Sequence, residues 1–263
     1  MSKHRFDNYF AYQKVLAQNV LVPYLEQHQI DLDGKNVADI GCGEGGIEAG
    51  LVGRYPGARF VCFDMNESYL AKARAMHIPN CEFLSYADLD QPQFADAFDF
   101  VIFREVIQST SEPEAIMKKV RTVSRPGSPI HVAFPPYHSP FGGNQHVARR
   151  SFVRFLPFIH LLPDALFWAL MANQTPEREE PGSFVAGFLD ELRAIRGTRI
   201  SIRKFRELCR RLGLTIVSEE CYFIRPAIAM RYGLPVIRNS LLGRAPLLRE
   251  IATSGALYLL RKE

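Results

Sequence analysis

The sequence predicts an α/β protein with a doubly wound, mostly parallel sheet of seven strands. Short apolar runs alternate with segments of helical periodicity through the first half of the chain. A glycine-rich turn, GCGEGG, follows the first of these runs. The run AFDFVIF is almost wholly apolar, as expected of a strand covered by helices on both faces. This alternation is typical of βαβ units with right-handed crossovers.

Each element is expected where the periodicity changes. The N-terminal helix, within residues 7–30, has apolar residues at three- and four-residue steps and should break near Pro23. The first strand is expected at residues 35–40. Further strands are expected at residues 59–63, 81–86, 97–103, 128–134, 215–224 and 255–260, and further helices at residues 47–54, 67–76, 113–124 and 201–212.

The chain is expected to form one domain, residues 1–263, with two additions to the sheet. Hydrophobic residues make up 47% of the 263 and charged residues 23%, which is near the average for globular domains. Residues 1–30 are interpreted as an N-terminal helical lid. After the fifth strand the rhythm breaks, and residues 135–197 are interpreted as a helical insertion over the active site, at the carboxyl edge where open α/β sheets bind ligands.

Composition excludes several classes of function. The net charge of +4 is mild and the basic residues form no long block, so no nucleic-acid partner is expected. Five cysteines without CxxC spacing indicate a reduced, cytoplasmic protein with no metal site. No secretory signal is recognised. Prolines and a charged residue interrupt the longest apolar stretch, residues 155–172, so no integral membrane span is expected.

The turn that follows the first strand is the strongest functional signal. Glycines let a ligand approach the backbone, and Asp64, after the second strand, is suited to accept hydrogen bonds from ribose hydroxyls. GCGEGG also satisfies GxGxxG, so an NAD(P)-dependent oxidoreductase is one interpretation. Asp39 places an anion beside the turn, which favours a cationic sulfonium over a pyrophosphate. Asp88, after the third strand, is suited to accept from an adenine amino group.

In chain order, the segments VADIGCGEGG, FDMN, ADLD and FDFVIFREV resemble the motif series of class I S-adenosylmethionine-dependent methyltransferases. The resemblance covers roughly residues 35–134 and implies S-adenosylmethionine as the cofactor. It implies cofactor contacts by Asp39, Gly41 and Gly43 at the methionine portion, Asp64 at the ribose, Asp88 at the adenine, and Phe103 and Arg104 at the sulfonium end. Cys42, Met65, Ala87 and Leu89 complete the expected cofactor-binding set.

Two histidines in the segment PPYHSPFGGNQH are candidate general bases. His138 and His146 have the side chain whose ordinary pKa lies nearest neutral pH. A loop histidine with only a structural hydrogen bond is the alternative for each, and a structural role is expected for His160. The large apolar residues between positions 152 and 171 are expected to pack against the N-terminal helix; an apolar acceptor pocket, a homodimer contact and membrane-surface docking are the alternatives.

The predicted function is transfer of a methyl group to O or N of a small-molecule or lipid-like acceptor, by in-line displacement with a histidine as the general base. Such a role belongs to biosynthesis. The alternatives are the NAD(P)-dependent oxidoreductase and a non-catalytic S-adenosylmethionine-binding protein.

Overall fold

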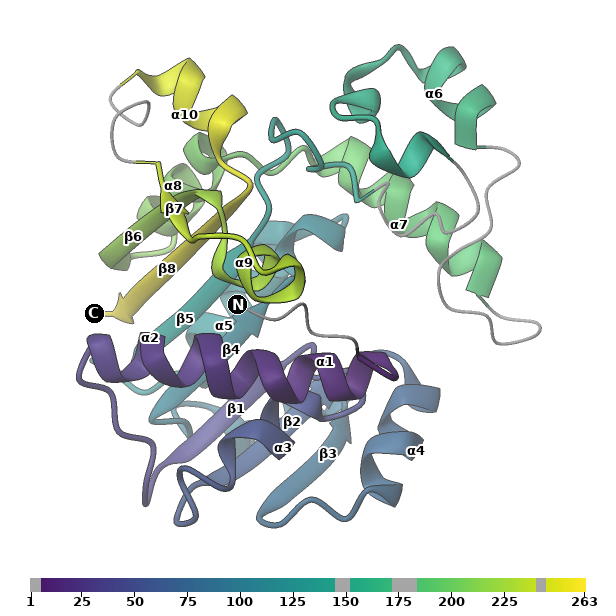
Figure 1. Ribbon diagram of the computed structural model, residues 1–263. Coiled ribbons are helices and arrows are strands. Elements are labelled where there is room, and N and C mark those ends of the chain that lie inside the picture. Colours follow the sequence, from purple (N-terminus) through teal and green to yellow (C-terminus); the bar gives the residue numbers. More distant parts are fainter. Residues whose placement is uncertain (1–5, 145–151, 172–183, 240–244) are drawn as a thin grey trace.

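One sheet of eight strands organises the fold (Figure 1). The computed structural model describes residues 6–144, 152–171, 184–239 and 245–263. The strand order is β3-β2-β1-β4-β5-β8-β6-β7. The strands are β1 (Asn36–Ile40), β2 (Arg59–Asp64), β3 (Cys81–Ser85), β4 (Phe100–Arg104), β5 (Pro129–Phe134), β6 (Leu214–Ile224), β7 (Ile237–Arg238) and β8 (Gly255–Lys262).

Strand directions confirm a mostly parallel, doubly wound sheet. Strands β1 to β5 pair in parallel. Strand β8 is antiparallel to both β5 and β6, so β6 runs in the same direction as the first five. The predicted number of seven strands was wrong, because β7 also pairs with β6. A strand of two residues is too short to show a period of two in the sequence.

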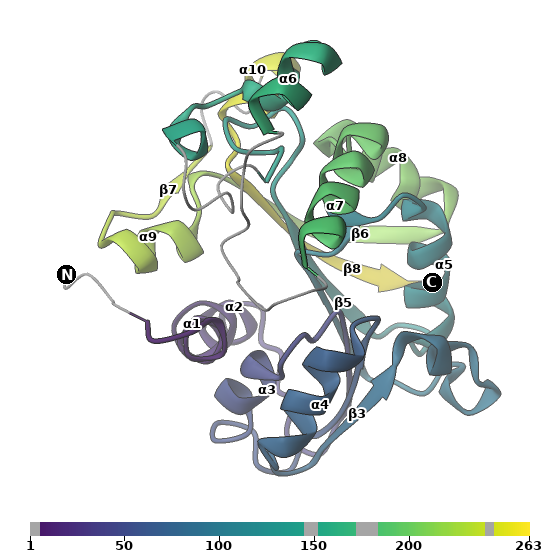
Figure 2. The same cartoon turned by 90° about the vertical axis from the view of Figure 1, so that its right-hand side faces the viewer.

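Helices cover both faces of the sheet (Figures 1 and 2). Side chains of α5 and α8, among them Met117 and Phe205, pack on one face, and side chains of α1, α3 and α4, among them Leu16 and Leu51, pack on the other. The helices are α1 (Tyr9–Leu16), α2 (Val22–Gln27), α3 (Gly46–Leu51), α4 (Glu67–Ala75), α5 (Pro113–Val123), α6 (Asp164–Met171), α7 (Phe184–Thr198), α8 (Ile202–Arg211), α9 (Pro226–Tyr232) and α10 (Pro246–Ala252).

The N-terminal helix does not break at Pro23, contrary to the sequence prediction. A π-helical segment, η1 (Ala17–Leu21), joins α1 to α2, and the Val22 N–H donates to the Ala17 carbonyl five residues earlier. Proline lacks the N–H that an α-helix requires at this point, and the wider π turn absorbs the irregularity without ending the helix. The helix therefore continues across the sheet face as part of the core; its role as a lid stays a prediction.

The insertion after β5 is helical, as predicted, but its apolar side chains pack elsewhere than expected. One buried apolar cluster of the insertion joins Leu192 of α7 to Val153, Phe167 and Met171. The predicted packing of these side chains on the N-terminal helix was therefore wrong. Apolar periodicity shows that a face must be buried but does not name its partner. Five large side chains between positions 152 and 171 stay exposed: Phe152, Phe155, Leu161, Leu166 and Leu170.

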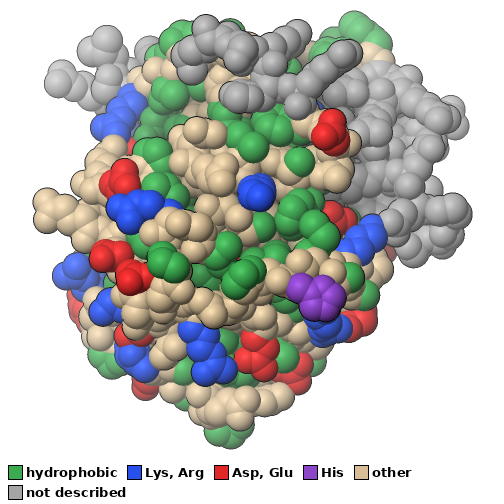
Figure 3. Space-filling model, turned by 60° about the horizontal axis from the view of Figure 1, so that its bottom comes forward, with side chains coloured by type: hydrophobic (Ala, Val, Ile, Leu, Met, Phe, Trp, Pro, Cys, Tyr) green, Lys and Arg blue, Asp and Glu red, His purple; other side chains and the backbone are tan. Residues whose placement is uncertain are grey.

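The carboxyl ends of the parallel strands face the viewer in Figure 2, with α1, α4 and α7 around them. On the face shown in Figure 3, basic and acidic side chains are interspersed with apolar ones. In the part of the chain that the structure describes, no helix has the length and apolar character needed to cross a bilayer.

The contact between α1 and α3 gives the first testable prediction. A Cβ on Gly50 would lie 2.5 Å from the Lys14 carbonyl oxygen and 2.6 Å from the Ala17 Cβ. Gly50→Ala should therefore push α1 off α3 and lower the free energy of unfolding by about 1–3 kcal/mol, measured by urea denaturation. Gly53→Ala is the matched control, because a Cβ there meets no atom of the described residues within 4 Å. Equal stability of the two variants would contradict this packing.

Candidate cofactor and acceptor site

The glycine turn after β1 is fixed against the end of β2. The amides of Gly41 and Cys42 donate to the Phe63 carbonyl at 2.7 and 3.2 Å. Gly41 has φ +92°, and a Cβ there would lie 2.2 Å from Cγ2 of Val106. Gly43 has φ +58°, and a Cβ there would meet no described atom within 4 Å. The turn therefore requires left-handed backbone and leaves space above Gly43.

Asp64, the last residue of β2, links the turn to the next helix. Its Oδ2 accepts from the Gly43 N–H and its Oδ1 from the Asn66 N–H, both at 2.8 Å. Asn66 in turn caps α4 by accepting from the Ser68 and Tyr69 amides at 3.0 and 3.3 Å. The half-buried carboxylate is thus held at the carboxyl edge, directly beside the glycine turn.

Asp39 and Glu48 form a buried pair of acids behind the turn. Asp39 is the fourth residue of β1 and Glu48 lies in α3; their exposed fractions are 3% and 0%. Burial, and then the neighbouring Glu48, raise the pKa of Asp39 well above its ordinary value. Burial likewise raises the pKa of Glu48 to about 8. The raised pKa favours the neutral form of Asp39, so the negative charge expected there requires a nearby cation that favours the ionised form.

The residues expected around the adenine follow β3. Asp88 lies in η2 (Tyr86–Asp90), where its carboxylate accepts from the Ser85 N–H at 3.1 Å and from the Gln91 side-chain amide at 2.8 Å. Ala87 and Met65 are exposed, whereas Leu89 is buried in the core. Asp88 thus has a structural role as a cap, and its oxygens keep lone pairs for a further donor.

The two residues expected at the sulfonium end point to opposite faces of the sheet. Phe103 is fully buried in the core cluster that contains Met117 of α5. Arg104, the next residue of β4, lies on the N-terminal helix side, within electrostatic range of Tyr12 and Asp39. Side chains alternate along a strand, so only Arg104 of this pair can direct its side chain toward the N-terminal helix.

The histidines divide into three cases. His146 lies outside the described residues. Nδ1 of His138 is 3.8 Å from Oε2 of Glu250 in α10, and the His138 side chain is 45% exposed. His160 is buried, its Nε2 is 2.6 Å from the Tyr137 carbonyl, and burial lowers its pKa to about 4. The structural role expected for His160 is therefore supported, while the roles of His138 and His146 stay predictions.

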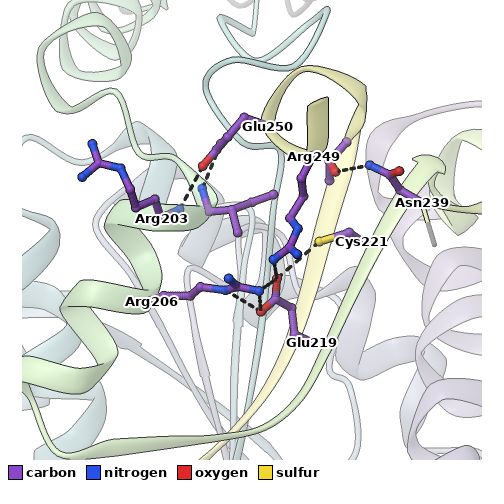
Figure 4. Close-up of polar contacts among 9 residues, drawn as sticks. Arg203, Arg206, Glu219, Cys221, Asn239, Arg249 and Glu250 are labelled. Carbon is purple, nitrogen blue, oxygen red and sulfur yellow. Dashed lines mark hydrogen bonds and ion pairs between the residues drawn. The ribbon is translucent and has the colours of Figure 1, made fainter. Parts of the chain in front are cut away.

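A polar network ties α8 and α10 to the sheet (Figure 4). Glu219 of β6 accepts from Arg206 of α8 at 2.7 and 2.8 Å, and Arg249 of α10 lies 3.9 Å away. Glu250 caps α8 by accepting from the Ile202 and Arg203 amides at 3.2 and 2.9 Å. The same Glu250 faces His138, so this network also restrains the segment that follows β5.

Residues 31–147 match the family model described as a methyltransferase domain. Over these residues the chain is similar to methyltransferase domains. The matched segment holds the glycine turn, Asp64, Asp88 and Arg104. It extends past β5, and α6, α7, β6 and β8 lie beyond it.

Curated relatives match the methyltransferase domain and little more. A ubiquinone biosynthesis O-methyltransferase of Acinetobacter baylyi is 35% identical over 118 residues, which are 42% of this chain and 47% of the relative. A trans-aconitate 2-methyltransferase of Deinococcus radiodurans is 29% identical over 102 residues, 39% of this chain and 38% of the relative. The chain thus spans less than half the length of these relatives.

Solved structures resemble the whole chain in fold. The PH0226 protein of Pyrococcus horikoshii has a TM-score of 0.58 at 16% identity, with 98% of this chain and 93% of that chain covered. The plantazolicin methyltransferase BamL, solved with a substrate analogue and S-adenosylhomocysteine (SAH), has a TM-score of 0.55 at 12% identity, with 98% and 87% covered. At these identities the likeness shows the fold alone.

Four polar residues around the methyltransferase domain's site were not foreseen from the sequence. They are Glu48, Glu105, His131 and Arg225. Glu48 carried a weak signal, since a glutamate among apolar residues directly after a glycine turn faces inward. His131 lies in the middle of β5, where burial and then Arg104 lower its pKa well below its ordinary value. Arg225 comes from the far end of the chain, and only the fold brings it near Glu105.

The raised pKa of Glu48 gives a testable prediction for stability. In the unfolded chain this acid ionises near its ordinary pKa of 4.5, whereas in the folded chain it keeps its proton up to about pH 8. The folded state then binds more protons between these values, so the group lowers stability as pH rises, by up to about 1 kcal/mol per pH unit. Glu48→Gln should lose less stability than the wild type between pH 5.5 and 7.5 in urea denaturation.

The comparison uses the difference between the two proteins, because groups away from the Asp39–Glu48 pair contribute equally to both. Parallel pH profiles of the wild type and Glu48→Gln would show that Glu48 is ionised in the fold.

Proposed function

We propose that this chain is an S-adenosylmethionine-dependent methyltransferase acting on O or N of a small-molecule or lipid-like acceptor. The observation that carries the proposal is the position of Asp64, which is held at the end of β2 against the Gly43 amide, beside open space above the turn. A carboxylate so placed can accept hydrogen bonds from the two hydroxyls of a ribose.

The described residues fit the cofactor. Open space above Gly43 admits the ligand, and Asp64 would hold the ribose. Asp88 would hold the adenine, with Ala87, Leu89 and Met65 as neighbours. The backbone at Gly41 and Cys42 would face the methionine portion, with the buried Asp39–Glu48 pair behind it. When bound, the cofactor supplies an electrophilic methyl group on a sulfonium.

The chain's own part in the reaction is to orient the acceptor, exclude water and accept a proton. Methyl transfer is an in-line displacement, and alignment of the reacting groups supplies much of the acceleration. The insertion and α1 stand around the carboxyl edge, where they can shield it from solvent (Figure 2). His146, and His138 as the second candidate, would accept the proton of a hydroxyl or protonated amine.

The relatives support a small-molecule acceptor. One relative is named for ubiquinone biosynthesis and another for trans-aconitate, and both names refer to small molecules. An NAD(P)-dependent oxidoreductase fits less well, because the segment that contains the glycine turn matches a methyltransferase family model. A non-catalytic binding protein stays the second candidate. The cytoplasmic location, the homodimer and the absence of a nucleic-acid partner stay predictions.

Calorimetry with SAH tests the cofactor proposal. The wild type should bind SAH and not NAD. Asp64→Asn should lower the affinity for SAH about tenfold or more, since an amide offers one acceptor where the carboxylate offered two. Asp90→Asn is the matched control, because the Asp90 side chain is 61% exposed and pairs with Lys119. Unchanged SAH affinity in Asp64→Asn would remove Asp64 from the site.

The general base is tested by release of SAH in the presence of acceptors. With any acceptor that wild type methylates, His146→Ala should lower turnover by about 10²–10⁴-fold while SAH affinity holds. His138→Ala, measured in parallel, distinguishes the two candidates. Full turnover of His146→Ala would exclude it as the base, and failure of wild type with every acceptor would favour the non-catalytic alternative.

A further inference from the structure

Two arginines from distant parts of the chain line one small cavity beside the proposed site. Arg104 is the last residue of β4, and Arg225 lies between β6 and α9. The cavity lies at the ends of β4 and β5 and the start of β8, under Val20 of η1. Its position is one strand beyond the glycine turn, on the side away from Asp64 and Asp88.

Arg104 lacks a partner for part of its guanidinium. Its Nη1 is buried, and no described residue accepts a hydrogen bond from it. Burial, and after it the charge of Arg225, oppose its ionisation and lower its pKa, whereas Glu105 acts in the opposite direction. A buried cation with an unused donor is unfavourable unless an anion completes the site.

Arg225 is also incompletely satisfied. Its Nη1 donates to Oε1 of Glu105 at 2.5 Å, but its Nε is buried and has no acceptor among the described residues. The arginine lies against Gly255, where a Cβ would come within 2.5 Å of its Cδ. Glu105 itself has φ +56°, a left-handed conformation that is unusual for a glutamate. The backbone at both positions thus permits the ion pair.

The charges at this point do not balance. Among the described residues, Glu105 pairs with Arg225 and also acts on Arg104, whereas the pKa of Asp39 is raised well above its ordinary value. The walls around the arginines are apolar, with Ala133, Phe134 and Leu257 from β5 and β8. The cavity therefore offers unused guanidinium donors, which suit the carboxylate group of an acceptor whose body lies outside the cavity.

We propose that Arg104 and Arg225 form a carboxylate-binding subsite for the acceptor, so that the molecule to be methylated is a carboxylic acid. This inference rests on the proposed function and narrows its substrate class. The alternative source of a carboxylate is the amino-acid end of the cofactor. The location on the β5 and β8 side of the glycine turn favours the acceptor, because the nucleoside would lie over β2 and β3.

Binding of small acids to the SAH-saturated protein tests the proposal. Benzoate and succinate are titrated by calorimetry against their uncharged counterparts, benzamide and succinamide. The wild type should bind at least one acid about tenfold or more tightly than its amide. Arg104→Met and Arg225→Met should remove that preference, and Arg225→Met should change SAH affinity less than threefold. Arg59→Met, which removes a 68% exposed arginine at the start of β2, should keep it.

The possible outcomes are distinct. Equal binding of each acid and its amide to wild type overturns the subsite, and this arm needs no variant to fold. A large loss of SAH affinity in both arginine variants, with the acid preference intact, assigns the arginines to the cofactor and also overturns the proposal. Failure of the wild type to bind SAH contradicts the proposed function itself.

Discussion

The structure depends on how the chain leaves β1. The turn must cross the end of β2 in a left-handed conformation, and the Phe63 carbonyl and the Asp64 carboxylate hold its amides there. Because the turn is fixed, α3 starts directly after it. Gly46 and Gly50 of α3 let α1 pack closely against α3, and this contact holds α1 beside the turn. A single hydrogen-bonded turn thus sets the position of the proposed cofactor site and of the helix that borders it.

The carboxyl edge carries opposite charges on its two sides. Asp64 ends β2 and Asp88 follows β3, whereas Arg104 and Arg225 lie at the ends of β4 and β6. Such a division would hold a cationic donor on the acidic side and a carboxylate acceptor on the basic side. Attraction between the two bound molecules would then assist the alignment that an in-line transfer requires.

Sequence patterns predicted most of the fold because strands and helices in a βαβ series are local features. The glycine turn with Asp64 could be recognised for the same reason, since its geometry depends on neighbouring residues. Arg225 could not be assigned, because its partner Glu105 is distant in the sequence and meets it only through β8 and α9. The prediction of what the insertion packs against was wrong for a related reason. Apolar spacing indicated a buried face, but the spacing does not identify the partner, and in the structure the partner is α7 and not the N-terminal helix. The helix break predicted at Pro23 was wrong, because the π-helical segment before it accommodates the missing proline N–H without ending the helix.

A crystal structure of the full chain with SAH would locate the cofactor. We expect the nucleoside over the ends of β2 and β3, with its ribose hydroxyls about 2.6–3.2 Å from the Asp64 carboxylate. We expect the methionine portion above Gly43. A nucleoside bound elsewhere, or one that leaves Asp64 without a ligand contact, would show that Asp64 and the glycine turn do not form the cofactor site.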